Sequence, residues 1–104
     1  MQTKQQILVS IKSQVQQVLP NADIILFGSR ANGLFTEESD WDILVLSDNP
    51  VTKKVKQVVH DKIFPLSVSI GAFINVLIIG KKDWHQNPSY YSLKKTVALN
   101  NQPI

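Results

Sequence analysis

The sequence predicts an α+β domain in which a small, mixed and mainly antiparallel sheet is flanked by helices. Short apolar, β-branched runs alternate with amphipathic segments in the order helix, strand, strand, helix, strand, helix. The first two strands are joined by a segment too short for a crossover helix, so we expect them to pair antiparallel. With 104 residues and 43% apolar content, the chain suits a single domain over residues 1–104.

The first predicted helix covers residues 4–19 and ends before Pro20. Thr3 and Gln6 have the pattern of a capping box at its start. Its apolar residues repeat at helical spacing: Ile7, Leu8, Ile11, Val15, Val18 and Leu19.

The two early strands are predicted at residues 24–27 and 42–46, because both runs are short and wholly or mostly apolar. Between them we expect a short helical turn at 29–32 and a loop at 33–39.

The second long helix follows Pro50, which we expect in its first turn, with Ser47 or Asp48 as its cap. The helix is predicted to break or kink near Phe64 and Pro65 and to resume as far as about Ile70. A strand after Pro65 is the alternative, because the apolar residues there also alternate.

The last third of the chain begins with a strongly apolar strand at 73–79 and a helical turn at 81–84. Asn87 and Pro88 read as the cap and first residue of a final helix at 89–97. Residues 100–104 are expected to be a loose tail.

Two polar motifs interrupt this apolar framework. Gly28 and Ser29 form a tight turn after the first strand, where backbone N–H groups can bind an anion. Asp40 and Asp42 are two residues apart at the start of the second strand, and residues at that spacing point to one face. Two carboxylates in one small volume repel each other unless a cation is present. The pattern predicts a site for a nucleoside triphosphate with Mg²⁺.

Arg30 follows the turn and is a candidate for bidentate phosphate binding. Its guanidinium could instead pair with a carboxylate of Glu37, Glu38 or Asp40. These two interpretations place the same side chain either toward a ligand or toward the loop.

The spacing of the two motifs resembles the signature of the DNA polymerase beta-like nucleotidyltransferase superfamily, and most closely that of its minimal prokaryotic members. The matching residues are Gly28-Ser29, ten intervening residues and Asp40-Trp41-Asp42, with Arg30-Ala31-Asn32-Gly33 and Lys81-Lys82-Asp83-Trp84 as further points of likeness. The resemblance implies transfer of a nucleoside monophosphate from a triphosphate, with ATP expected, to an acceptor hydroxyl. It also implies a sheet of the nucleotidyltransferase type.

By this resemblance, Gly28 and Ser29 hold the β- and γ-phosphates, and Asp40 and Asp42 are the catalytic pair that holds Mg²⁺. Active members carry a third carboxylate on a later strand. The strand at 73–79 has no Asp or Glu, and Asn75 stands near the expected position. A neutral amide is a weaker ligand than a carboxylate, so the alternative is an inactive nucleotide-binding, metal-binding or antitoxin-like module.

The remaining composition limits the partners and the location. No cysteine is present, which excludes disulfides and thiolate metal sites. The net charge of +3 comes from scattered lysines, so it does not indicate a nucleic-acid partner. No membrane span or signal-peptide core is seen, and we expect a cytoplasmic protein. The resemblance implies a HEPN-type helical partner in a toxin–antitoxin pair, and an uncovered sheet edge would allow a homodimer.

Overall fold

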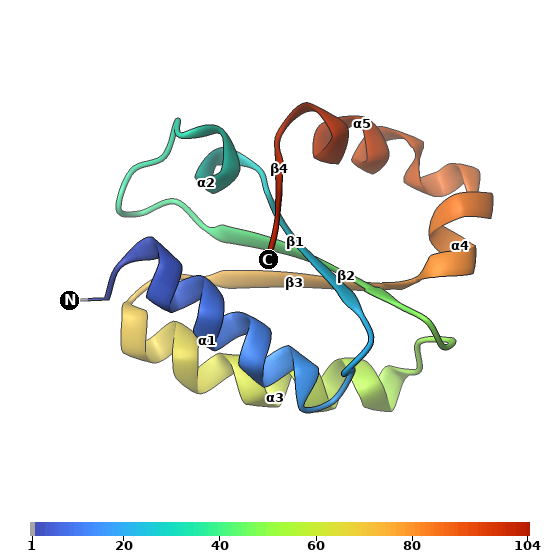
Figure 1. Cartoon of the computed structure of the whole chain (residues 1–104), viewed down its shortest axis with the longest axis horizontal. Coiled ribbons are helices and arrows are strands. Elements are labelled where there is room, and N and C mark those ends of the chain that lie inside the picture. The colour runs from blue at the N-terminus through green and yellow to red at the C-terminus, as the bar shows by residue number, and fades with distance from the viewer. Residues whose placement is uncertain (1) are drawn as a thin grey trace.

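The computed structural model describes residues 2–104, and Met1 lies outside the described part of the chain. Its elements are α1 (Lys4–Gln16), β1 (Asp23–Phe27), α2 (Ser29–Asn32), β2 (Trp41–Ser47), α3 (Lys53–Ile70), β3 (Ile74–Gly80), α4 (Lys81–Gln86), the 3₁₀ helix η1 (Pro88–Tyr90), α5 (Tyr91–Leu99) and β4 (Asn101–Pro103). One sheet contains the strands in the order β3-β2-β1-β4 (Figure 1). The predicted α+β class is confirmed.

The sheet is mixed and mainly antiparallel, as predicted. β1 pairs antiparallel with β2 on one side and with β4 on the other. β2 and β3 run parallel, and α3 supplies the crossover that a parallel pair requires.

Helices cover both faces of the sheet. α1 and α3 lie on one face, and α4 and α5 lie over the other (Figure 1). Because side chains alternate along a strand, Trp41, Ile43 and Val45 face α1 and α3, whereas Leu44 and Leu46 face α4 and α5. The alternation places Asp42 on the same face as Leu44.

The first helix begins as predicted. The Thr3 hydroxyl accepts from the Gln6 N–H, and the Gln6 side chain accepts from the Thr3 N–H, which completes the capping box. α1 ends at Gln16, three residues before the predicted end, although Val18 and Leu19 still pack against the core.

The start of α3 differs from the prediction. Thr52 is the cap, and its hydroxyl accepts from the Val55 N–H at 3.1 Å. Ser47 and Asp48 do not cap this helix, because pairing of Ser47 with Gly80 extends β2 to Ser47.

α3 continues through Pro65 to Ile70, so the predicted helical course to Ile70 is confirmed, the alternative strand after Pro65 is wrong, and the helix is not broken at Phe64 and Pro65. Ile63 on one side of the proline and Leu66 and Ile70 on the other pack against the same core. Packing of the apolar stripe therefore maintains the helix across a residue that interrupts its hydrogen bonds. No helix within residues 2–104, including α3, is long and apolar enough to cross a membrane.

The end of the chain differs most from the prediction. Asn87 caps through the Ser89 N–H as expected, but it opens the 3₁₀ helix η1, and α5 starts only at Tyr91. The expected loose tail is wrong, because Asn101–Pro103 forms β4 and the Ile104 N–H donates to the Ile24 carbonyl at 2.9 Å. The strand forms because its backbone pairs with that of β1, and the polar sequence of residues 100–104 does not indicate such a pairing.

Candidate functional site

The candidate site begins with the turn that ends β1. Gly28 has φ +75° and ψ −156°, a combination open essentially to glycine alone. The chain then enters α2, and the first helical hydrogen bonds run from the Ala31 and Asn32 N–H groups to the Gly28 carbonyl. The N–H groups of Ser29 and Arg30 precede these bonds, as in the first turn of any helix.

Gly28 lies directly against Asp42. A Cβ atom on Gly28 would be 2.5 Å from Asp42 Oδ2, a distance shorter than the 3.0 Å below which Cβ atoms essentially never approach another heavy atom. The antiparallel register explains this approach, because Phe27, the residue before Gly28, pairs with Asp42. Glycine is therefore required here to leave room for a carboxylate of the protein itself.

Asp42 also meets Asn75. The two residues pair in the parallel register of β2 and β3, and Asn75 Nδ2 donates to Asp42 Oδ1 at 3.3 Å. Three segments thus converge on one carboxylate: the end of β1, the start of β2 and the start of β3. Asn75, which the resemblance places near a third acidic position, thus lies beside Asp42.

Burial raises the pKa of Asp42 above its ordinary value, and the nearby charge of Asp40 raises it further. The hydrogen bond from Asn75 acts in the opposite direction and is outweighed by the loss of solvent. Asp40 itself is exposed at the end of the loop, one residue before β2. A half-buried carboxylate beside a second carboxylate is an unfavourable arrangement until a cation neutralises it.

Arg30 is directed toward the loop, as one of its two predicted interpretations has it, but it bonds to backbone carbonyls there and not to a carboxylate. Its side chain is only 8% exposed, and its guanidinium donates to the backbone carbonyls of Ser39 and Glu37. Its Cζ atom lies 4.7 Å from the ring centroid of Phe35 and 4.5 Å from that of Trp41. The alternative ion pair with a loop carboxylate is not found among residues 2–104. The aromatic residues Phe35, within the loop, and Trp41, directly after it, were the available signal for this packing.

The donor set offers oxygen ligands only. Asp40 and Asp42 provide carboxylates and Asn75 provides an amide oxygen, a set that fits a hard cation such as Mg²⁺. Within the described residues 2–104, no cluster of three or more His, Cys, Asp or Glu side chains forms a metal-binding group. The chain therefore offers two carboxylates with a neutral third neighbour.

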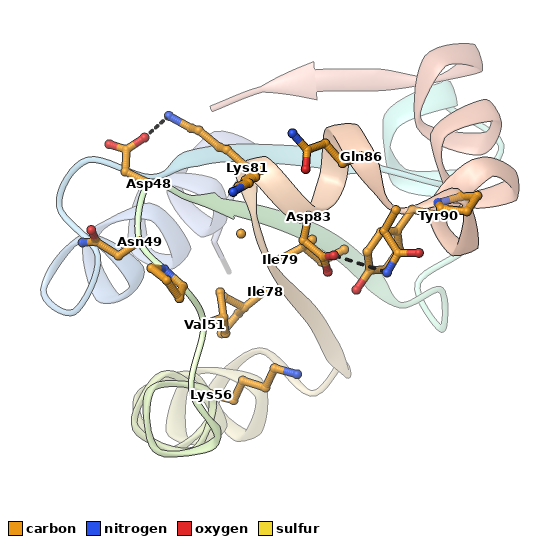
Figure 2. Close-up of a pocket in the computed structure, with 15 residues that line it drawn as sticks. Asp48, Asn49, Val51, Lys56, Ile78, Ile79, Lys81, Asp83, Gln86 and Tyr90 are labelled. Atoms are coloured by element: carbon orange, nitrogen blue, oxygen red, sulfur yellow. Dashed lines mark hydrogen bonds and ion pairs between the residues drawn. The ribbon is translucent and has the colours of Figure 1, made fainter.

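A separate cavity lies at the opposite end of the sheet. It has a volume of about 690 Å³ and opens where β2 and β3 end, between α3 and α4 (Figure 2). Ile78 and Val51 contribute apolar lining, and at the rim Lys81 Nζ pairs with Asp48 at 2.5 Å. The lining includes none of the candidate site residues, so this cavity and the Asp42 cluster are distinct features.

A model of the nucleotidyltransferase domain family matches residues 8–96 of the sequence. The matched segment starts within α1, ends within α5 and includes every candidate site residue. A comparison with curated proteins found no match.

Solved structures with the same fold include two kinds of protein. The crystal structure of spectinomycin adenyltransferase AAD(9) from Enterococcus faecialis, with ATP and spectinomycin, is similar with a TM-score of 0.77 and 20% identity. The match covers 98% of this chain but 56% of that protein. A toxin–antitoxin structure with AMP-PNP has a TM-score of 0.63 and 20% sequence identity, and the match covers 91% of this chain and 69% of that chain. The structure of the tri-AMPylated Shewanella oneidensis HEPN toxin in complex with MNT antitoxin has a TM-score of 0.63 and 18% sequence identity. The match covers 97% of this chain and 71% of that chain. At these identities the likeness concerns the fold.

Proposed function

Because the chain belongs to the nucleotidyltransferase domain family, we propose that it transfers a nucleoside monophosphate from a triphosphate, with ATP as the first choice, to an acceptor hydroxyl. In this reaction the acceptor oxygen bonds to the α-phosphorus, the bond from that phosphorus to the leaving oxygen breaks, and pyrophosphate departs. The acceptor proton is released to water. The meeting of Gly28, Asp42 and Asn75 at one point of the sheet is the observation that supports this proposal.

In the proposed complex the turn after β1 binds the β- and γ-phosphates. The early N–H groups of α2 and the Ser29 hydroxyl are the donors for these anions. Arg30 adds a buried positive charge close behind the turn, which favours an anion there even without direct contact.

Asp40 and Asp42 would hold a divalent cation, Mg²⁺ by preference, and Asn75 would complete the set with an amide oxygen. When bound, such an ion neutralises charge that develops on the transferred phosphoryl group. The raised pKa of Asp42 supports this assignment, because a cation would relieve the cost of the half-buried carboxylate.

The acceptor and its binding surface are proposed to come from a partner protein. This chain spans 56% of the length of AAD(9), so it matches only part of that protein. A HEPN-type helical protein is the proposed partner, because the MNT antitoxin of similar fold is seen with an AMPylated HEPN toxin. A cytoplasmic location and a homodimer stay predictions from the sequence.

A second candidate function is a binding module with little or no turnover, and Asn75 is the observation that favours it. A carboxylate in this place would help to deprotonate the acceptor, and an amide does so poorly. On this hypothesis the chain holds nucleotide and cation, or only its partner.

The two functions can be separated by incubating the protein with α-labelled nucleoside triphosphates, Mg²⁺ and the product of a neighbouring gene as the candidate partner. We expect label on the partner, with a decrease of about a hundredfold or more in Asp42→Asn, because loss of a metal ligand removes several kcal/mol of transition-state stabilisation. Asp61→Asn, on the exposed side of α3, is the matched control.

Asn75→Asp is the informative third variant. If wild-type protein binds ATP tightly but transfers none of the four nucleotides, while Asn75→Asp does transfer, the binding-module hypothesis is correct. If neither protein transfers label and neither binds nucleotide or the partner, both functions are wrong.

A further inference from the structure

Arg30 is the only arginine in the sequence, and it is one of the two buried polar or charged side chains in residues 2–104. A buried guanidinium with no carboxylate partner needs other sources of stabilisation. Here they are two aromatic rings and two backbone carbonyls, all from residues 35–41.

The carbonyl of Ser39 accepts two of the three hydrogen bonds that Arg30 donates. Arg30 Nε donates to this oxygen at 3.3 Å and Nη2 donates to it at 3.0 Å, so two N–H groups of the guanidinium bind one carbonyl oxygen. This carbonyl belongs to the peptide bond that joins Ser39 to Asp40. Its orientation therefore sets the direction in which the chain reaches Asp40.

The loop has little else to fix it relative to α2. The other side-chain hydrogen bonds within residues 33–40 are local, as between the Thr36 N–H and the Ser39 hydroxyl, or join Leu34 to Asn32. Arg30 alone among the described side chains reaches across seven and nine residues to bond with the loop. Asp40 is exposed and lies outside β2, so the sheet does not hold it as it holds Asp42.

We propose that Arg30 is a positioning residue that fixes the loop at residues 33–40 and thereby places Asp40 beside Asp42, and that it does not act as a ligand for the nucleotide phosphates. The inference rests on the proposed function for its consequence at the cation site. The effect of Arg30 on the order of residues 33–40 can be measured whether or not the protein has transferase activity.

The test compares wild type with Arg30→Lys and Arg30→Met. Lysine keeps the positive charge but cannot form the fork or stack flat on the rings. We expect hydrogen–deuterium exchange in residues 33–40 to rise about tenfold in both variants, while exchange in β1, β2 and β3 is unchanged. We also expect the dissociation constant for Mn²⁺, measured by electron paramagnetic resonance, to rise about tenfold in both. Lys53→Met, which removes an exposed cation from the start of α3, is the control.

A phosphate ligand would behave differently. If Arg30→Lys resembles wild type in exchange and Mn²⁺ affinity, and only the KM for ATP rises in Arg30→Met, the inference is wrong. If no protein shows transfer but the exchange and Mn²⁺ effects are seen, the proposed function fails and the positioning role stands.

Phe35→Leu provides a second route should the arginine variants fail to fold. It removes one of the two rings and leaves the hydrogen bonds of Arg30 in place. Phe35 is 43% exposed, so the fold should tolerate the change. We expect exchange in residues 33–40 and the dissociation constant for Mn²⁺ each to rise about threefold. If neither changes, the inference is wrong.

Discussion

At the scale of single residues, the contact between Gly28 and Asp42 is the most restrictive feature of the site. Gly28 needs its hydrogen side chain for two reasons, because φ is +75° and because a Cβ would meet Asp42 Oδ2 at 2.5 Å. Gly33 is a natural comparison, since it also has a positive φ but has no atom within 4 Å of an added Cβ. Gly33 has ψ 0°, in the left-handed helical region, whereas Gly28 has ψ −156°, so Gly28 carries more backbone strain as well as the collision, and only removal of Asp42 separates the two.

We predict that Gly28→Ala lowers the free energy of unfolding by about 2–4 kcal/mol, and Gly33→Ala by about 1 kcal/mol. Urea unfolding measures both. In an Asp42→Ala background the cost of Gly28→Ala should fall toward that of Gly33→Ala, because the colliding carboxylate is gone. Equal costs in the two backgrounds would show that the contact with Asp42 is unimportant.

For Asp42 we predict the opposite effect, in that replacing the residue stabilises the protein. Its pKa is raised in the folded protein, so the folded state binds its proton more tightly than the unfolded state does. The resulting stabilisation is present below the ordinary pKa near 3.8 and is lost as the pH rises through the folded pKa. At pH 7 without metal, the ionised carboxylate therefore lowers stability.

Asp42→Asn should accordingly raise the Tm of the metal-free protein at pH 7, by about 2–4 °C for a gain of about 0.5 kcal/mol. The difference should shrink toward pH 4, and Mg²⁺ should raise the Tm of wild type only. Thermal unfolding at both pH values, with Asp61→Asn as control, checks this. A variant less stable than wild type at pH 7 would show that burial of the charge is not the dominant effect.

At the scale of elements, α3 shows how packing overrides a local rule. Pro65 lies in the interior of the helix, where it removes a hydrogen bond to the carbonyl of Asp61 and crowds that carbonyl. The helix persists because its apolar residues on both sides of the proline pack into one core. The local cost remains and should be measurable.

We predict that Pro65→Ala stabilises the protein by about 1–2 kcal/mol, less than the full helix cost of proline because alanine also gives the unfolded chain more freedom. Denaturant unfolding measures the change. Ser69→Ala, one turn later and also exposed, is the matched control and should gain less than about 0.5 kcal/mol. A neutral or destabilising Pro65→Ala would mean that α3 does not bear this cost.

β4 illustrates the reverse case, in which an element has almost no local signal. Its three residues have low strand propensity, and they form a strand because the outer edge of β1 offers unpaired backbone groups. The early strands were predictable because their own apolar runs identify them. An element whose stability comes from a partner strand far away in the sequence cannot be recognised from its own residues.

At the scale of the whole molecule, the parallel pairing of β2 and β3 and the antiparallel pairing of β1 and β2 bring the site together. Asp42 belongs to both registers, so it receives Asn75 from one side and Gly28 from the other. The same architecture places the 690 Å³ cavity at the opposite end of β2 and β3. A ligand in that cavity would therefore act on the Asp42 cluster only through the sheet.

The residues of the candidate site were readable in the sequence, because glycine at a turn and two acids at strand spacing carry their chemistry in their types and separation. The existence of the main helices and of the first three strands was predictable for the same local reason, but the start of α3, its unbroken course through Pro65 and the 3₁₀ helix before α5 were not. The interest of Asn75 came from the family resemblance. The contacts of Arg30 with the loop carbonyls, the close approach of Gly28 to Asp42 and the strand at the end of the chain were not predictable. These depend on which segments become neighbours, and that choice is made by burial of the whole apolar core and by backbone pairing, which no short stretch of sequence specifies.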